Sequence, residues 1–166
     1  TALLADLVRC PTTLGNAAGG QARLLAHLQG MGLQAEAWDI EPAELQDDPR
    51  FVRVDRAFAG RPNVTATLPA AGAGGRSLLF NGHIDVVSPE PLARWTRDPW
   101  GGEIDGGRLY GRGAYDMKAG LVQALLAIQA VMDAGVSLRG SVHFESVIEE
   151  ECTGNGTLAA RRRAAP

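Results

Sequence analysis

The sequence predicts an α/β domain in which a mixed β-sheet is flanked by helices. Segments with apolar side chains at helical spacing alternate along the chain with short apolar segments of strand length. One of these strands, residues 63–68, alternates apolar and polar side chains, as expected of a strand with one buried face. A Gly-rich turn joins this strand to the next one, which predicts an antiparallel hairpin within the sheet.

In chain order, the first half is expected to contain two helices, one strand and the hairpin: residues 3–8, 21–31, 33–40, 63–68 and 77–81. Cys10 and Pro11 end the pattern of the first helix, and glycines close the second. Residues 41–60 are acidic, aperiodic and contain proline. They are therefore expected to form a surface connection rather than a domain boundary.

The second half is expected to contain a long connection, a helix and a strand. Residues 83–115 show no sustained period, and a connection of this length is usually functional or mobile. Trp95 and Trp100 are expected to anchor it by packing. Residues 117–134 predict a largely buried helix, which Gly135 would end. Residues 141–148 predict a strand that leads directly into three glutamates.

Length and composition exclude several classes of protein. A chain of 166 residues can form one domain with a sizeable core, so residues 1–166 are treated as one unit. Hydrophobic residues make up 45% and charged residues 21%, which is ordinary for a globular protein. The net charge is only −3, and no basic block favours nucleic acid. No apolar segment approaches the roughly 18 residues of a membrane span, so neither nucleic acid nor a membrane is an expected partner.

The two cysteines, Cys10 and Cys152, lie far apart and outside any Cys-x-x-Cys pattern. Neither a disulfide framework nor a thiolate zinc site is therefore indicated. This usage fits a reducing compartment, and the expected location is the cytoplasm. Because the chain begins at Thr1 and not at a methionine, a removed leader or an upstream segment stays open.

The residues that can carry chemistry lie at junctions between regular elements and loops. His83 and Asp85 follow a strand, Asp116 precedes the buried helix, and residues 149–151 are glutamates that follow another strand. Strand ends and the starts of the following helices gather along one edge of an α/β sheet, so these groups can converge. Imidazole and carboxylates without thiolates suit zinc, manganese or cobalt. Two such ions about 3.5 to 4 Å apart activate water and polarise an amide carbonyl, while a free carboxylate moves the proton.

Each of these residues also has a simpler explanation. Asp116 has the position of a helix N-cap, and the three glutamates can form a solvated charge run. Asp85 can be an ordinary loop carboxylate or the group that orients His83. His27 and His143 fall inside a helix and a strand and are expected to be structural.

Three separated motifs then occur in a fixed order: "NGHIDVV", "WGGEIDGGRLYGRGAYDMKAGL" and "VIEEECTGNGTLA". Together they resemble the zinc metallopeptidase and deacylase family of acetylornithine deacetylase, succinyl-diaminopimelate desuccinylase, aminoacylase and glutamate carboxypeptidase. The resemblance covers about residues 63–160. It implies a two-metal, aminopeptidase-like catalytic domain that cleaves the amide bond of an N-acyl amino acid, as acetylornithine deacetylase does, or of a small peptide.

The resemblance also assigns roles by motif. It implies that His83 binds one metal ion, Asp116 bridges both, and Glu151 binds the other. Glu150 corresponds to the general base, and Asp85 to the catalytic aspartate behind the histidine. The implied cofactor is a pair of Zn²⁺ ions, with Co²⁺ or Mn²⁺ as possible replacements.

Members of this family are considerably longer. They carry a lid domain with substrate and dimer contacts, and a further carboxylate and a late histidine that complete the metal site. The resemblance therefore implies that these residues are the N-terminal portion of a catalytic domain, without the lid and inert alone, and that the longer form is a homodimer. The alternative from another class is a non-catalytic binding or scaffold remnant of the same fold.

Overall fold

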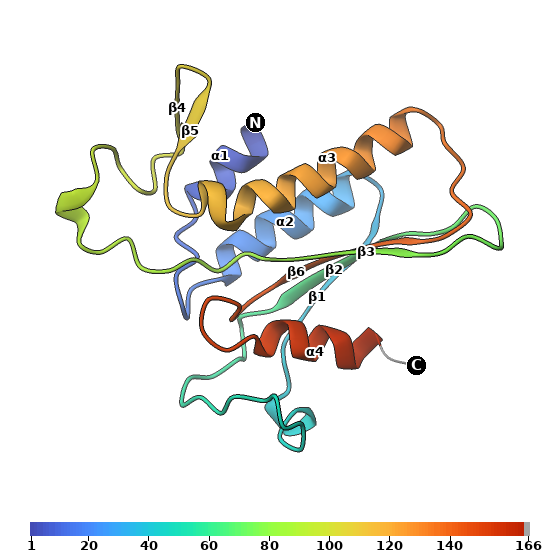
Figure 1. Cartoon of the computed structure of the whole chain (residues 1–166), viewed down its shortest axis with the longest axis horizontal. Coiled ribbons are helices and arrows are strands. Elements are labelled where there is room, and N and C mark those ends of the chain that lie inside the picture. The colour runs from blue at the N-terminus through green and yellow to red at the C-terminus, as the bar shows by residue number, and fades with distance from the viewer. Residues whose placement is uncertain (165–166) are drawn as a thin grey trace.

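The computed structural model describes residues 1–164, and over this range it is an α/β fold with a four-stranded mixed sheet and helices on both faces (Figure 1). This confirms the predicted fold class. The helices are α1 (Ala2–Val8), α2 (Ala18–Gly30), α3 (Ala119–Asp133) and α4 (Asn155–Ala164). The strands are β1 (Gln34–Trp38), β2 (Asn63–Leu68), β3 (Leu78–His83), β4 (Glu103–Asp105), β5 (Arg108–Tyr110) and β6 (Val142–Val147). In this part of the chain no helix is long and apolar enough to cross a membrane.

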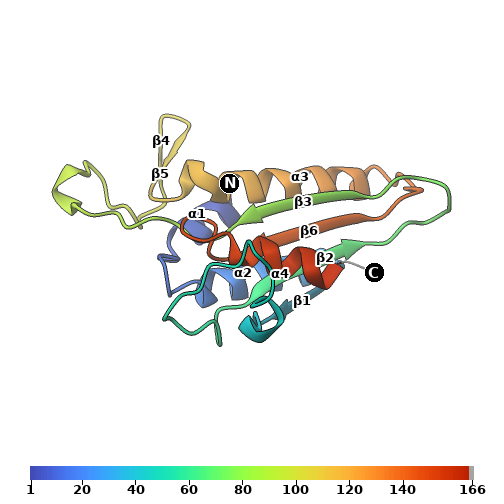
Figure 2. The same cartoon turned by 60° about the horizontal axis from the view of Figure 1, so that its bottom comes forward.

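The main sheet has the strand order β1-β2-β6-β3, which Figure 2 shows from the side of α4. β1 pairs with β2 and β2 with β6 in antiparallel fashion, whereas β3 runs parallel to β6. Helices α2 and α3 cover one face of this sheet, and α4 lies against the other (Figures 1 and 2). The strands β4 and β5 form a separate two-stranded sheet.

The predicted hairpin between residues 63–68 and 77–81 is wrong, because β6 lies between β2 and β3. Burial explains the order. Phe144 and the three residues that follow it in β6 are all buried, which favours a central position. Leu78 and Leu79 of β3 are half exposed, which suits an edge strand. The Gly-rich turn after β2 instead pairs with the segment before β6, where the Gly75 amide donates to the Arg139 carbonyl at 3.0 Å.

The core lies between the sheet and the two helices on its first face. In α3, the buried residues recur at helical spacing and pack against β3 and β6: Leu121, Val122, Leu125 and Ile128. The opposite side of α3 is exposed, as Leu126 shows, so the expectation of a largely buried helix holds for one face only. As predicted, Gly135 follows the helix in the left-handed conformation, with φ of 65°.

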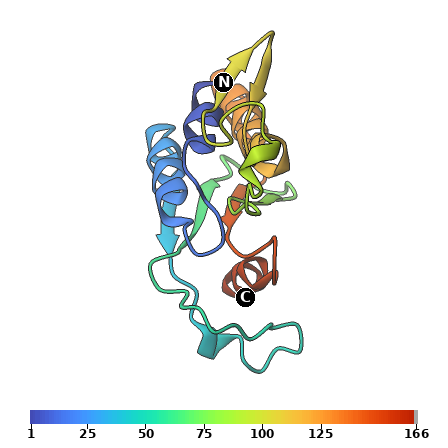
Figure 3. The same ribbon diagram turned by 90° about the vertical axis from the view of Figure 1, so that its left-hand side faces the viewer.

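Both long connections differ from the sequence prediction. The connection between β1 and β2 lies at one end of the molecule, opposite the β4–β5 hairpin (Figure 3). It is more than a surface connection, since Leu45 and Phe58 belong to the core. In the second connection, β4 and β5 were not predicted, although the Gly106-Gly107 pair that joins them is a known hairpin signal.

Candidate metal centre

The parallel pairing of β3 and β6 brings the first and third motifs together. His83, the last residue of β3, is in register with Val147, the last residue of β6. The Ile84 amide extends the pairing by donating to the Val147 carbonyl at 2.9 Å. Residues that follow both strands therefore emerge at the same edge of the sheet, which is where ligands bind in open α/β sheets. The convergence expected from the sequence has this topological cause.

Asp116 reaches the same edge from an irregular turn, Ala114–Lys118, that leads into α3. Its backbone is extended, with φ of −115° and ψ of 105°, and the N-cap position of α3 belongs to Lys118. Asp116 is therefore not the helix N-cap. The buried Lys118 ammonium holds the turn against α1 by donating to the carbonyls of Leu7 and Cys10 at 2.8 and 2.9 Å.

His83, Asp116 and Glu151 converge at this edge. Each offers one ligand atom, and the three atoms lie within 4.8 Å of one another. The His83 imidazole is buried, and its Nε2 lies 3.2 Å from Asp116 Oδ1 and 3.5 Å from Glu150 Oε2. The side chains of Asp116 and Glu150 are 69% and 51% exposed, so the centre is open on its carboxylate side. Solvent therefore reaches these carboxylates directly.

The hydrogen bonds of His83 show that this donor set fits a metal ion. His83 Nδ1 lies 2.8 Å from the Asp85 carbonyl, which can only accept a hydrogen bond, so Nδ1 carries a proton. The other ring nitrogen, Nε2, faces the carboxylates of Asp116 and Glu150. These groups are all acceptors, and either a second proton or a cation must lie between them. An imidazole with carboxylates is a typical ligand set for zinc.

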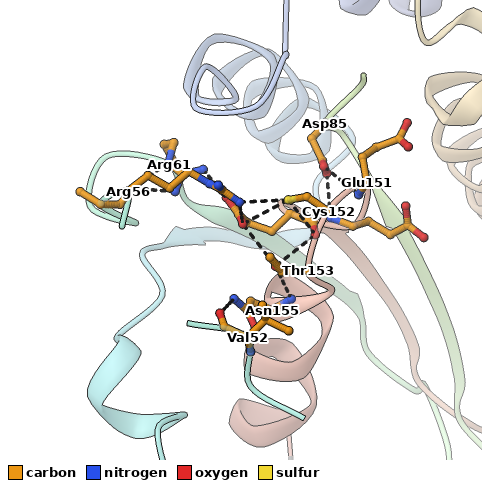
Figure 4. Close-up of polar contacts among 11 residues, drawn as sticks. Val52, Arg56, Arg61, Asp85, Glu151, Cys152, Thr153 and Asn155 are labelled. Carbon is orange, nitrogen blue, oxygen red and sulfur yellow. Dashed lines mark hydrogen bonds and ion pairs between the residues drawn. The ribbon is translucent and has the colours of Figure 1, made fainter. Parts of the chain in front are cut away.

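Asp85 contacts two parts of the centre. Its carbonyl orients the His83 ring, whereas its carboxylate lies 3.8 Å from Nδ1. The carboxylate also accepts the backbone amides of Glu150 and Glu151 at 3.3 and 3.1 Å, and Figure 4 shows Asp85 beside Glu151. Burial raises the pKa of the Asp85 carboxyl, although the two amides and His83 partly offset this effect. The orienting contact to the histidine thus comes from the Asp85 backbone. The Asp85 carboxylate instead holds the turn that contains Glu150 and Glu151, here called the glutamate turn.

The three glutamates differ in environment, so a uniformly solvated charge run is wrong. Glu149 is buried and forms ion pairs with Arg56 and Arg61, whereas Glu150 is exposed. Burial would raise the pKa of Glu149, but the hydrogen bonds from the two arginines outweigh it and lower the pKa to about 2. Burial raises the pKa of Glu151, and the carboxylates of its neighbours add to this effect although His83 opposes it.

Arg56 and Arg61 were not among the residues singled out in the sequence. They come from the connection between β1 and β2 and contact Glu149 from 93 and 88 residues away. Nothing in their spacing marks them, because the partner of an arginine depends on how the connection folds back. One signal was available: three consecutive glutamates after an apolar strand require positive charge nearby.

Comparisons with known proteins agree with the fold and the motifs. The chain is 35% identical over 150 residues to succinyl-diaminopimelate desuccinylase from Rhodospirillum centenum, which is 90% of this chain and 35% of the relative. It is 32% identical over 149 residues to N-formyl-4-amino-5-aminomethyl-2-methylpyrimidine deformylase from Bacillus subtilis, which is 89% of this chain and 31% of that relative. The chain thus spans about a third of the length of these relatives.

The fold is similar to that of an M20-family metallo-carboxypeptidase from Sulfolobus solfataricus, with a TM-score of 0.72 and 23% identity over 90% of this chain and 30% of the other. The model of peptidase family M20/M25/M40 matches residues 79–165, which is more than half of the chain and includes every candidate ligand. The predicted resemblance is therefore confirmed at the level of the family. This chain belongs to the peptidase family M20/M25/M40.

Proposed function

We propose that this chain supplies metal ligands and the general base of a two-metal hydrolase that cleaves the amide bond of an N-acyl amino acid or a small peptide. The observation that carries the proposal is the convergence of His83, Asp116 and Glu151 within 4.8 Å, with Glu150 beside them. Membership of the peptidase family supports the same reaction class.

In this proposal His83 Nε2, Asp116 and Glu151 would hold the metal, and Asp116 would be the ligand that two ions share. Zinc suits these donors, and cobalt or manganese can replace it. When bound, the metal polarises the scissile carbonyl and makes water a better nucleophile. Glu150 takes a proton from the attacking water and delivers it to the leaving amine as the C–N bond breaks and the new C–O bond forms. The Asp85 carboxylate positions Glu150 by accepting its amide.

The substrate class follows from what the relatives share. The names desuccinylase and deformylase both describe removal of an acyl group, succinyl in one relative and formyl in the other. We therefore propose a small N-acylated amine as substrate. The acetylornithine deacetylase type remains a prediction, as do the cytoplasmic location and a homodimeric longer form.

A cobalt titration of the chain tests the metal ligands. We expect Co²⁺ to give a visible absorption band with the 166-residue chain, and Asp116→Ala to weaken binding at least tenfold because the shared ligand is lost. Asp47→Ala is the matched control, since Asp47 is exposed and remote in sequence from every candidate ligand. Equal affinity of Asp116→Ala and the unmodified chain would refute the assignment of Asp116. Absence of any binding by the unmodified chain would favour the scaffold alternative.

A further inference from the structure

The turn after β6 is held from two sides. On one side the Asp85 carboxylate accepts the amides of Glu150 and Glu151. On the other side, Arg56 and Arg61 contact Glu149, and Figure 4 labels the two arginines. We propose that Glu149 is a positioning residue, whose ion pairs with these arginines fix the turn from which Glu150 and Glu151 reach the metal centre. This inference rests on the proposed function.

The contacts of Glu149 are close and shielded from water. Arg56 donates from Nε and Nη2 to the two carboxylate oxygens at 2.8 and 2.5 Å, and Arg61 Nη1 donates to Oε1 at 2.6 Å. The Glu149 side chain is fully buried. Thr153 and Cys152 add weaker hydrogen bonds to Oε2. A bidentate arginine fixes the direction as well as the position of a carboxylate, so Glu149 has little freedom.

The backbone of Glu149 makes this restraint necessary. Its φ is 69°, and among residues 1–164 it is the one non-glycine residue in the left-handed region. Such a conformation costs free energy for a residue with a Cβ and persists where the surroundings impose it. Its side chain contacts the arginines, whereas the next residue, Glu150, faces His83. The ion pairs therefore act where the chain changes direction toward the metal centre.

One of the two arginines, Arg61, is itself held in place. Arg61 donates from Nε and Nη2 to the Ala57 carbonyl at 2.9 and 2.6 Å, and its guanidinium lies 5.3 Å from the centre of the Phe58 ring. A second tie joins the same connection to the start of α4, because the Asn155 side chain bonds both backbone groups of Val52 at 2.7 and 3.1 Å (Figure 4). The irregular connection between β1 and β2 thus presents two cations to one carboxylate, and it fixes Arg61 by its own contacts.

Two substitutions of Glu149 separate its charge from its backbone. Glu149→Gln keeps the shape of the side chain but removes the charge that pairs with both arginines. Glu149→Gly removes the side chain and relieves the left-handed backbone, which glycine adopts freely. If the ion pairs position the turn, both variants make the turn more mobile. Glu149→Gly does so even though it also relieves the strain of the left-handed backbone. Asp48→Asn is the matched control, because Asp48 pairs with Arg50 in the same connection and with Arg162 in α4 and does not contact the turn.

Two measurements are made on each variant. Amide hydrogen exchange of the metal-free chain reports on Glu150 and Glu151, whose amides are bonded to Asp85. The Co²⁺ dissociation constant and visible band report on the geometry of the ligands. We expect both Glu149 variants to raise exchange at these two amides at least tenfold and to weaken Co²⁺ binding by about 10- to 100-fold. Exchange in the centre of α3 stays unchanged, as do both readouts for Asp48→Asn.

Conservative variants of the arginines extend the test and replace Glu149→Gln if it does not fold. Arg61→Lys keeps the charge, so it should retain more Co²⁺ affinity than Arg61→Gln. Arg56→Lys, at a side chain that is one-third exposed, should raise exchange at Glu150 and Glu151 without unfolding the chain. Equal effects of Arg61→Lys and Arg61→Gln on Co²⁺ affinity would count against positioning through the charge.

The outcomes separate this inference from the proposed function. Co²⁺ binding and exchange at Glu150 and Glu151 that are the same in Glu149→Gln and the unmodified chain would overturn the positioning role and leave the metal site standing. Failure of every chain to bind Co²⁺ would instead overturn the metal site. Amide hydrogen exchange is then the only test of the positioning role. Faster exchange at Glu150 and Glu151 in Glu149→Gln supports the role, and unchanged exchange refutes it.

Discussion

At the scale of single residues, the backbone does much of the positioning. His83 receives its orienting contact from the carbonyl of Asp85, while the carboxylate of Asp85 binds the amides of Glu150 and Glu151. One residue thereby links the histidine at the end of β3 to the glutamates after β6. The same glutamate turn depends on Glu149 from its other side. These links explain how ligands from separate loops can keep a common geometry.

Asp85→Asn tests the first of these links. The carboxamide keeps one acceptor oxygen, but its NH₂ group then faces one of the two amide donors of Glu150 and Glu151. Because Asp85 is buried, we expect the free energy of unfolding of the metal-free chain to fall by about 1 to 3 kcal/mol. Urea unfolding measures the change, and Asp133→Asn in the exposed last turn of α3 is the control. A difference of less than about 0.5 kcal/mol, the usual range for surface substitutions, would show that the carboxylate does not hold the turn.

At the scale of elements, α4 approaches the end of β6 through a glycine. A Cβ on Gly156 would lie 1.9 Å from the Ile148 carbonyl oxygen, and the Gly156 carbonyl accepts the Asn63 side chain at 2.9 Å. Asn63 Oδ1 in turn accepts the Ile148 amide at 3.0 Å. A small residue at position 156 therefore lets α4, β2 and the end of β6 meet directly before the glutamates.

Gly156→Ala is expected to destabilise the chain by about 1 to 3 kcal/mol or more, because the contact is with backbone that cannot move aside. Thermal or urea unfolding measures the loss. Gly19→Ala in α2 is the matched control, since a Cβ there meets nothing within 4 Å. That substitution should be neutral or stabilise by about 0.5 to 1 kcal/mol. A Gly156→Ala chain as stable as the unmodified one would contradict this packing.

At the scale of the whole molecule, the described residues bring three ligands to a centre that is proposed to bind two ions. Structural zinc sites usually have four protein ligands, and catalytic sites have three in addition to water. With Asp116 shared, each ion would receive two ligands from these residues.

We therefore expect the isolated 166-residue chain to bind zinc weakly and to be inert. An assay with N-succinyl, N-formyl and N-acetyl amino acids and added Zn²⁺ should show no release of the free amine above the rate with buffer. The Asp116→Ala chain is the control for contaminating activity, since a contaminant would hydrolyse substrate in both preparations. Clear turnover that depends on Asp116 would contradict the expectation of an inert chain.

The fold could be predicted where local patterns decide it. The strand at residues 63–68, the helix before Gly135 and the strand before the glutamates follow from hydrophobic period and glycine placement, and all three are present. The hairpin prediction failed because pairing of strands depends on which strand is buried in the folded chain, and β6 is buried from Phe144 to Val147. A turn between neighbours in sequence carries no information about a strand that enters between them later.

The sequence by itself determined the family and the candidate ligands, because His83, Asp116 and Glu151 lie in motifs whose residue types and spacing can be read along the chain. Only the tertiary structure decided how these residues meet. The parallel pairing of β3 and β6 places two motifs at one edge of the sheet, and Arg56 and Arg61 reach Glu149 across about 90 residues. Such contacts depend on the packing of the whole chain, which no local pattern encodes.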